Sequence, residues 1–183
     1  MLPRARAIPM AVATWIAYLC AHFVLVPGWF AWRFRRSPYA LRWLPRNGYD
    51  LGESAYGLLV AVYTLAVLLG PLTEPRWTVL AVACVIAGSA LIVWAVAALG
   101  ASWRIGQNES DTTCVYVAHG PYRFLRHPIY LGMTISALGQ MLLTNGDIRG
   151  LTLLVGTVTY GLLQGRVESR RWSNRIDDER GRP

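Results

Sequence analysis

Five long apolar stretches constrain the fold of this chain more than any other feature. They cover residues 10–30, 55–72, 77–99, 129–144 and 150–165. A helix that crosses a bilayer needs about 20 mostly apolar residues, with a range of about 17–25. The first three stretches reach or approach this length, and the last two are shorter and separated by a short connection. We therefore predict an all-α polytopic membrane protein with five transmembrane helices, the last two forming a helical hairpin.

The composition agrees with a protein embedded in lipid. Of the 183 residues, 54% are hydrophobic and only 15% are charged, which is too apolar for an ordinary soluble domain. The formal charge of +8 would also suit a nucleic-acid-binding protein. However, the arginines cluster between the apolar stretches, where membrane topology explains them. We expect a single integral-membrane domain over residues 1–183, with the bilayer as its partner and no nucleic acid.

The arginines also predict the orientation of the chain. With five spans, the N-terminus and the second and fourth loops share one side and carry four arginines. The first loop, the third loop and the C-terminal tail share the other side and carry fourteen. Because basic loops remain in the cytoplasm, the N-terminus is expected outside and the C-terminus inside. A long apolar run without a clear cleavage site favours an uncleaved first helix over a signal peptide. We expect an integral protein of a bacterial inner membrane.

The stretch "GPYRFLRHPIYLG", residues 120–132, leads into the fourth apolar segment. Proline suits the first turn of a helix, and it disfavours helical geometry in the residue before it. A helix is therefore predicted to begin at Pro128, with His127 at its N-terminal end. The free N–H groups and the dipole of that end favour an anion.

Three further side chains of this stretch allow two interpretations. The turn at Gly120 is expected to bring Tyr122 and Arg123 to the N-terminal end of the helix. Arg123 and Arg126 could then stabilise a bound carboxylate or phosphate. Alternatively, both arginines bind lipid phosphates, and Tyr122 and Tyr130 belong to an interfacial aromatic belt.

Glu168 directly follows the fifth apolar stretch. Because the helical hairpin returns the chain to its starting face, Glu168 is expected near His127. A carboxylate there could hold a cationic ligand group, or it could form an ordinary salt bridge with Arg166 or Arg171. The later acidic run, residues 177–179, is expected to be solvated.

The motif resembles the signature of the isoprenylcysteine carboxyl methyltransferase family and of the related membrane phospholipid methyltransferases. The family pattern G-P-Y-R-x-x-R-H-P-x-Y-x-G is matched throughout residues 120–132, and "LGASWR" at residues 99–104 resembles the segment after the third helix of the family. The resemblance implies a membrane enzyme that transfers a methyl group from S-adenosylmethionine to a lipophilic small-molecule or prenylated acceptor. The enzyme it most resembles is protein-S-isoprenylcysteine O-methyltransferase.

The resemblance also implies a cytoplasmic cofactor region formed by residues 100–128 and 166–183. No metal is expected, because the three cysteines lack metal-binding spacing. The residues expected to bind the cofactor are Tyr122, Arg123, His127, Pro128, Tyr130 and Glu168. Those expected to be catalytic are Arg126 and Glu168.

The tail departs from the family pattern, in which two adjacent acids follow an arginine and precede a tyrosine-containing cap. Here Glu168 fits the first acid, but Ser169 stands at the second position, and Asp178 and Glu179 are an alternative acid pair. The acceptor group remains open among carboxylate, amine and thiol. Two other functions remain possible: an NADPH-dependent enzyme similar to sterol reductases, and a degenerate non-catalytic membrane protein.

Overall fold

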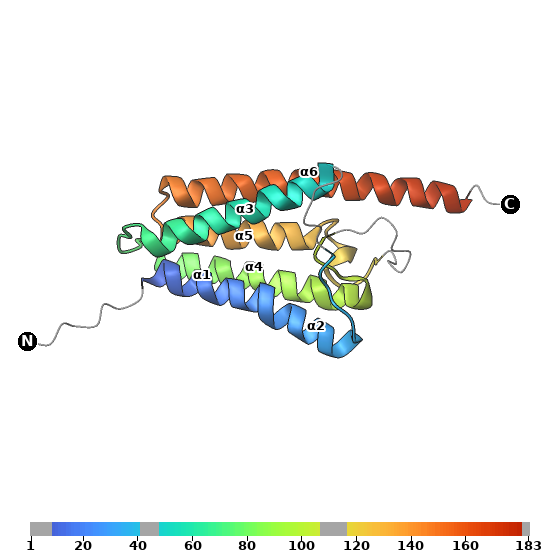
Figure 1. Cartoon of the computed structure of the whole chain (residues 1–183), viewed down its shortest axis with the longest axis horizontal. Coiled ribbons are helices and arrows are strands. Elements are labelled where there is room, and N and C mark those ends of the chain that lie inside the picture. Colours follow the sequence, from blue (N-terminus) through green and yellow to red (C-terminus); the bar gives the residue numbers. More distant parts are fainter. Residues whose placement is uncertain (1–8, 41–47, 107–116, 181–183) are drawn as a thin grey trace, which may run out of the picture.

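The computed structural model describes residues 9–40, 48–106 and 117–180, without the side chains of residues 48–49 and 171–180. Its helices run side by side along the long axis of the molecule (Figure 1). In chain order they are α1 (Met10–Cys20), the π-helix η1 (Ala21–Leu25), α2 (Val26–Phe34), α3 (Gly48–Leu69), α4 (Thr78–Leu99), the 3-10 turns η2 (Gly100–Ser102) and η3 (Gly120–Arg123), α5 (Pro128–Leu143) and α6 (Ile148–Arg180). Within the described ranges the β-structure is one isolated bridge, between Tyr39 and Ile105. The predicted all-α class is confirmed.

Three helical segments are long and apolar enough to cross a membrane: Met10–Phe34, Asp50–Leu69 and Thr78–Ser102. They correspond to the first three apolar stretches, and the chain is an integral membrane protein. The fourth stretch forms the shorter apolar helix α5, which has 16 residues. That α5 and α6 also cross the bilayer remains a prediction.

Helix α6 extends well past its apolar part. The fifth stretch ends at residue 165, whereas the helix continues to Arg180. Arginine and glutamate are good helix formers, so the charged segment can stay helical where the apolar pattern stops. The expected C-terminal part of the cofactor region is thus helical as far as residue 180.

Small residues let α4 and α5 pack closely. A Cβ added to Gly132 would lie 2.7 Å from the carbonyl oxygen of Gly88, and one added to Gly139 would lie 2.6 Å from that of Ala81. Close backbone approach at small residues is typical of helix pairs in membranes. The final glycine of the motif, Gly132, therefore has a packing role between the two helices.

A buried polar layer joins α1, α3 and α5. The Trp15 indole N–H donates to Thr64 Oγ1 at 2.9 Å, and the Tyr63 hydroxyl donates to Gln140 Oε1 at 3.3 Å. The amide of Gln140 in turn donates to Thr14 Oγ1 at 3.2 Å. Because these partners are far apart in sequence, the layer sets the register of three helices.

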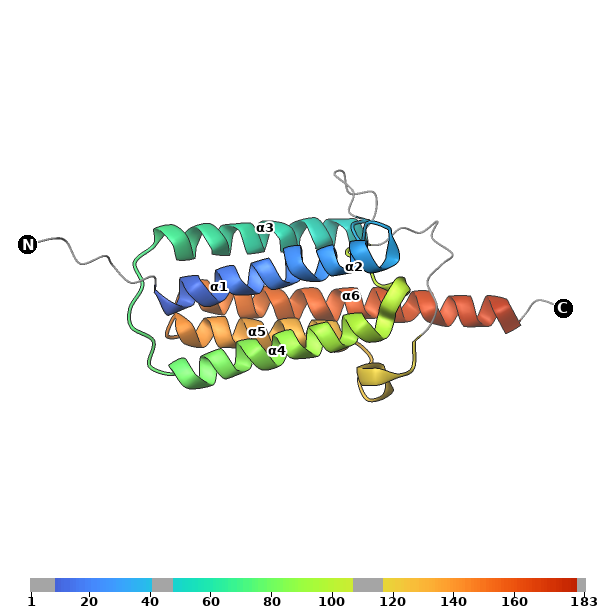
Figure 2. The ribbon, with the colours of Figure 1, turned by 90° about the horizontal axis from the view of Figure 1, so that it is seen from below.

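The bundle has two distinct ends. The start of α1, the α3–α4 connection and the α5–α6 turn lie together at one end (Figure 1, Figure 2). The end of α2, the starts of α3 and α5 and the polar part of α6 lie at the other end. The motif and Glu168 therefore meet at the same end of the molecule.

Candidate active site

Helix α5 begins at Pro128, as its sequence predicts. Pro128 is buried, and the preceding His127 is the non-helical N-cap, with φ −134° and ψ 66°. The His127 carbonyl accepts a hydrogen bond from the Leu131 N–H at 3.2 Å, which is a bond of the first helical turn. The backbone thus places the imidazole of His127 beside the free N–H groups of α5.

Glu168 lies at the centre of the polar groups on α5 and α6. One of its oxygens is 3.3 Å from His127 Nδ1, and the other accepts a hydrogen bond from the Tyr130 hydroxyl at 2.6 Å. The side chains of His127 and Glu168 remain 26% and 25% exposed, so a ligand can reach this pair. The expected proximity of Glu168 and His127 is present, and the described ion-pair partner is the histidine rather than Arg166. The side chain of Arg171 lies outside the described part of the chain.

Ser169 completes the contacts of His127. Its hydroxyl is 3.1 Å from His127 Nε2, so consecutive residues of α6 hold both ring nitrogens. In the tautomer that directs Nδ1–H toward Glu168, Nε2 accepts a hydrogen bond from the Ser169 hydroxyl. The residue at the position of the second family acid is therefore a partner of the motif histidine.

Tyr122 lies near enough to Glu168 to be affected by its charge. It belongs to η3, which Gly120 enters with a left-handed φ of +59°. Burial, and secondarily the negative charge of Glu168, raise the pKa of the Tyr122 hydroxyl. Tyr122 is therefore a neutral hydrogen-bonding group at physiological pH.

Two tyrosines that sequence reasoning missed extend the cluster into the bundle. The ring of Tyr160 on α6 meets Tyr130 edge-to-face at 5.7 Å, and Tyr56 on α3 stacks on Tyr160 at 4.3 Å. The Tyr56 hydroxyl lies 3.4 Å from Thr157 Oγ1. Tyr56 and Tyr160 stand in the second and fifth apolar stretches, but a tyrosine in an apolar stretch does not by itself identify its neighbour.

The sequence motif also contains two arginines. Arg123 and Arg126 are exposed, and the Arg123 guanidinium lies 5.7 Å from the ring centroid of Phe124. Neither forms an ion pair with another side chain that the structure describes. Their expected roles stay predictions, and the side chains of Asp178 and Glu179 lie outside the described part.

His127 and Glu168 are residue types that can also bind a metal ion. Within the described residues, no three His, Cys, Asp or Glu side chains come together in a way that could hold a metal ion.

Comparison with known proteins identifies the family that the motif resembles. Residues 80–171 match the Isoprenylcysteine carboxyl methyltransferase (ICMT) family. Phosphatidylethanolamine N-methyltransferase B of Dictyostelium discoideum is 39% identical over 80 residues, which is 42% of this chain and 40% of that relative. The chain thus matches less than half of the length of this curated relative, and no solved structure matches it. Because the family match covers half of the chain and includes His127, Tyr130 and Glu168, this protein belongs to the isoprenylcysteine carboxyl methyltransferase family.

Proposed function

We propose that this protein is an S-adenosylmethionine-dependent methyltransferase that acts on a lipophilic acceptor from the bilayer. The observation that carries the proposal is the arrangement of Glu168 between His127 and Tyr130 at the N-terminal end of α5. The family match supports methyl transfer as the reaction class.

The chemistry of the cluster fits this cofactor. Its sulfonium is a cation, which a carboxylate such as Glu168 attracts and which the tyrosine faces of Tyr130 and Tyr160 favour. Its amino-acid carboxylate suits the free N–H groups at the start of α5. When bound, S-adenosylmethionine supplies an electrophilic methyl group.

The residues of the chain then have positioning tasks. Tyr130 and His127 orient the Glu168 carboxylate from two sides, and Ser169 fixes the imidazole ring. Methyl transfer to a carboxylate or thiolate needs little acid–base help, so alignment of the partners and exclusion of water account for most of the rate. An amine acceptor would first have to lose the proton of its ammonium form. Arg126, on the exposed side, is proposed to orient the acceptor.

The acceptor is proposed from two classes. The family name points to a prenylcysteine carboxylate, whereas the relative is named for methylation of phosphatidylethanolamine. Either acceptor would enter from the membrane. We propose that the chain crosses the membrane five times, with its N-terminus outside and the site on the cytoplasmic side. Helix α5 would span about 24 Å, slightly less than a hydrocarbon core of about 30 Å.

Isothermal titration tests the cofactor directly. Purified protein should bind S-adenosylmethionine and not NADPH, and binding of NADPH alone would favour the reductase-like alternative. His127→Ala should weaken S-adenosylmethionine binding about 10- to 150-fold, because a hydrogen bond to a charged group is worth about 1.5–3 kcal/mol. The matched control is His119→Ala, which removes an exposed imidazole from the same loop. Unchanged affinity in a folded His127→Ala protein would limit His127 to helix capping.

A further inference from the structure

Ser169, His127 and Glu168 form a continuous hydrogen-bonded series at the candidate active site. The Ser169 hydroxyl oxygen is 3.1 Å from His127 Nε2, and His127 Nδ1 is 3.3 Å from a Glu168 carboxylate oxygen. Because an ionised carboxylate only accepts hydrogen bonds, the proton of the neutral ring is on Nδ1, and the unprotonated Nε2 faces the hydroxyl. A hydroxyl, an imidazole and a carboxylate in this order allow the histidine to take up a proton from the hydroxyl.

Neighbouring groups hold this series in place and leave it open to a ligand. The Tyr130 hydroxyl donates to the other oxygen of Glu168 at 2.6 Å. The titratable side chains with a described contact to the imidazole are Glu168 of α6 and Tyr130 of α5, whose ring centroid lies 5.9 Å from that of the imidazole. His127, Glu168 and Ser169 are all half-buried, so an acceptor can reach the serine hydroxyl.

Two opposing electrostatic effects act on a proton added to the His127 ring. The negative charge of Glu168, 3.3 Å from Nδ1, stabilises an imidazolium. The N-terminal end of α5 disfavours a cation, because the helix dipole is positive there. Glu168 therefore allows His127 to hold an extra proton during a reaction, and the dipole favours the later release of that proton to water.

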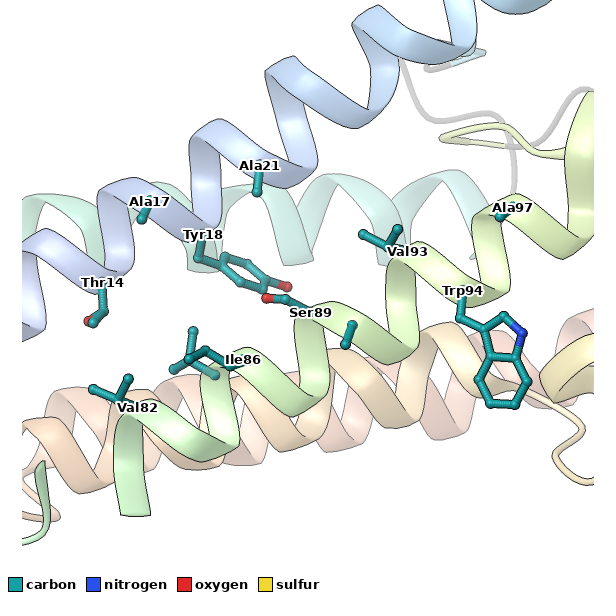
Figure 3. A pocket seen from close by; sticks show the side chains of 12 residues that line it. Thr14, Ala17, Tyr18, Ala21, Val82, Ile86, Ser89, Val93, Trp94 and Ala97 are labelled. Carbon is teal, nitrogen blue, oxygen red and sulfur yellow. The ribbon is translucent and has the colours of Figure 1, made fainter. Parts of the chain in front are cut away.

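The apolar groove between α1 and α4 contains no comparable group. It has a volume of about 630 Å³ and is lined mainly by aliphatic side chains. Its polar lining groups are the hydroxyls of Thr14, Tyr18 and Ser89 and the indole of Trp94 (Figure 3). None of these side chains takes up a proton at neutral pH. A chemical step that needs a base is therefore assigned to the candidate active site and not to this groove.

The need for a base depends on the class of acceptor. A carboxylate or thiolate is already ionised, so its lone pairs are free to attack a methyl group. An alkylamine has a pKa of about 10.4 and carries an additional proton at neutral pH, so its nitrogen has no free lone pair. The Glu168 carboxylate attracts an ammonium group and repels a carboxylate. The series thus suits an amine better than an acid.

We propose that Ser169 and His127 remove the proton of an ammonium acceptor before methyl transfer. The inference rests on the proposed function and names the class of its acceptor, an amine. One N–H bond of the ammonium breaks, and its electron pair stays on nitrogen. The proton passes to the Ser169 oxygen while the serine proton passes to His127 Nε2, which gives an imidazolium beside Glu168. The imidazolium then releases one proton to water for each methyl group transferred.

The test measures methyl transfer from labelled S-adenosylmethionine to vesicles that contain phosphatidylethanolamine as the amine probe. Ser169→Ala should lower kcat at pH 7 about 100-fold, the lower value for a general base. Its Kd for S-adenosylmethionine should change little, because Glu168 still holds the other ring nitrogen. Ser169→Thr keeps a hydroxyl and should retain most of the activity. Ser54→Ala, which removes an exposed serine of α3, is the matched control.

A pH series separates proton removal from a structural role. Below the pKa of the amine, each pH unit raises the fraction of free amine about tenfold. The kcat of Ser169→Ala should rise by that factor per unit between about pH 7 and 9. The wild-type kcat should rise much less, because the bound ammonium loses its proton to the protein. His127→Gln, which cannot take up a proton, is a second variant and should show the same slope as Ser169→Ala.

The outcomes separate this inference from the proposed function. A wild-type kcat in Ser169→Ala, or methylation of an S-farnesylcysteine derivative without any of phosphatidylethanolamine, overturns the inference alone. Equal losses of kcat and cofactor affinity, with the pH slope of wild type, would show a structural role and also overturn it. Absence of both S-adenosylmethionine binding and methyl transfer in wild type overturns both. Thermal unfolding in detergent establishes that each variant is folded.

Discussion

Gly165 of α6 lies directly against the imidazole of His127. A Cβ at position 165 would stand 3.0 Å from His127 Cδ2 and 3.3 Å from Nε2. One turn earlier, a Cβ on Gly161 would stand 3.0 Å from Cβ of Tyr130. The two glycines allow α6 to approach the start of α5 closely enough for Glu168 to contact both aromatic residues.

We expect Gly165→Ala to displace His127 and weaken S-adenosylmethionine binding about tenfold, the equivalent of one lost hydrogen bond. Gly57→Ala is the matched control, because Gly57 is an exposed helical glycine with nothing within 4 Å of an added Cβ. Titration gives the affinities, and thermal unfolding shows whether each variant is folded. Equal affinities for the two variants would mean that the position of His127 does not matter for the cofactor.

Glu168→Gln keeps the shape of the side chain and removes its charge. We expect it to weaken binding of S-adenosylmethionine more than binding of S-adenosylhomocysteine, because only the former carries a sulfonium cation. The measurement is the ratio of the two Kd values in wild type and variant. An equal loss for both ligands would assign Glu168 to the shared amino-acid part or to the structure of the site. No loss for either ligand would favour Asp178 and Glu179 as the acids that hold the cofactor.

We expect the folded protein to lose stability in acid because of Asp147, which lies at the α5–α6 turn. Burial alone would raise its pKa, but hydrogen bonds from the Arg149 side chain and the Gly150 N–H, with the arginine charge, lower it below the ordinary value of 3.8. Because its pKa is lower in the folded state, the ionised Asp147 carboxylate stabilises the protein above pH 3.8. This contribution is lost as the pH falls through the folded-state pKa. Arg149 also donates to the carbonyls of Ala66 and Pro71, so the pair ties α6 to the end of α3.

We therefore expect Asp147→Asn to lower the unfolding free energy by about 1 kcal/mol near neutral pH, the upper value for a partly exposed pair. The difference from wild type should shrink as the pH approaches 3. Thermal unfolding in detergent between pH 3 and 7 measures both effects. Glu74→Gln, in the neighbouring connection, is the control. A difference that is independent of pH would assign the effect to hydrogen bonding rather than to charge.

The distribution of arginines predicts the orientation in the membrane. A reporter fused after Pro183 should be active in the cytoplasm, and one inserted at residues 73–74 should report the opposite side. The reason is the ratio of fourteen arginines to four between the two sides. Reporters that give the same side at both positions would contradict the three spans predicted between them and the placement of the site.

The sequence by itself determined the features that depend on local chemistry. Long apolar runs predicted the helices, because a chain in lipid must satisfy its backbone hydrogen bonds internally. The position of Pro128 predicted where α5 begins, because proline cannot donate within a helix but fits its first turn. The motif and the return of the chain through α6 were enough to place Glu168 near His127.

Only the tertiary structure decided which distant residues share the site. Tyr56 reaches the cluster by stacking on Tyr160, which lies far away along the chain, and Ser169 meets His127 across two helices. Sequence patterns report the face and length of each helix, whereas these contacts depend on the rotation and register of one helix against another, which close packing at glycines sets.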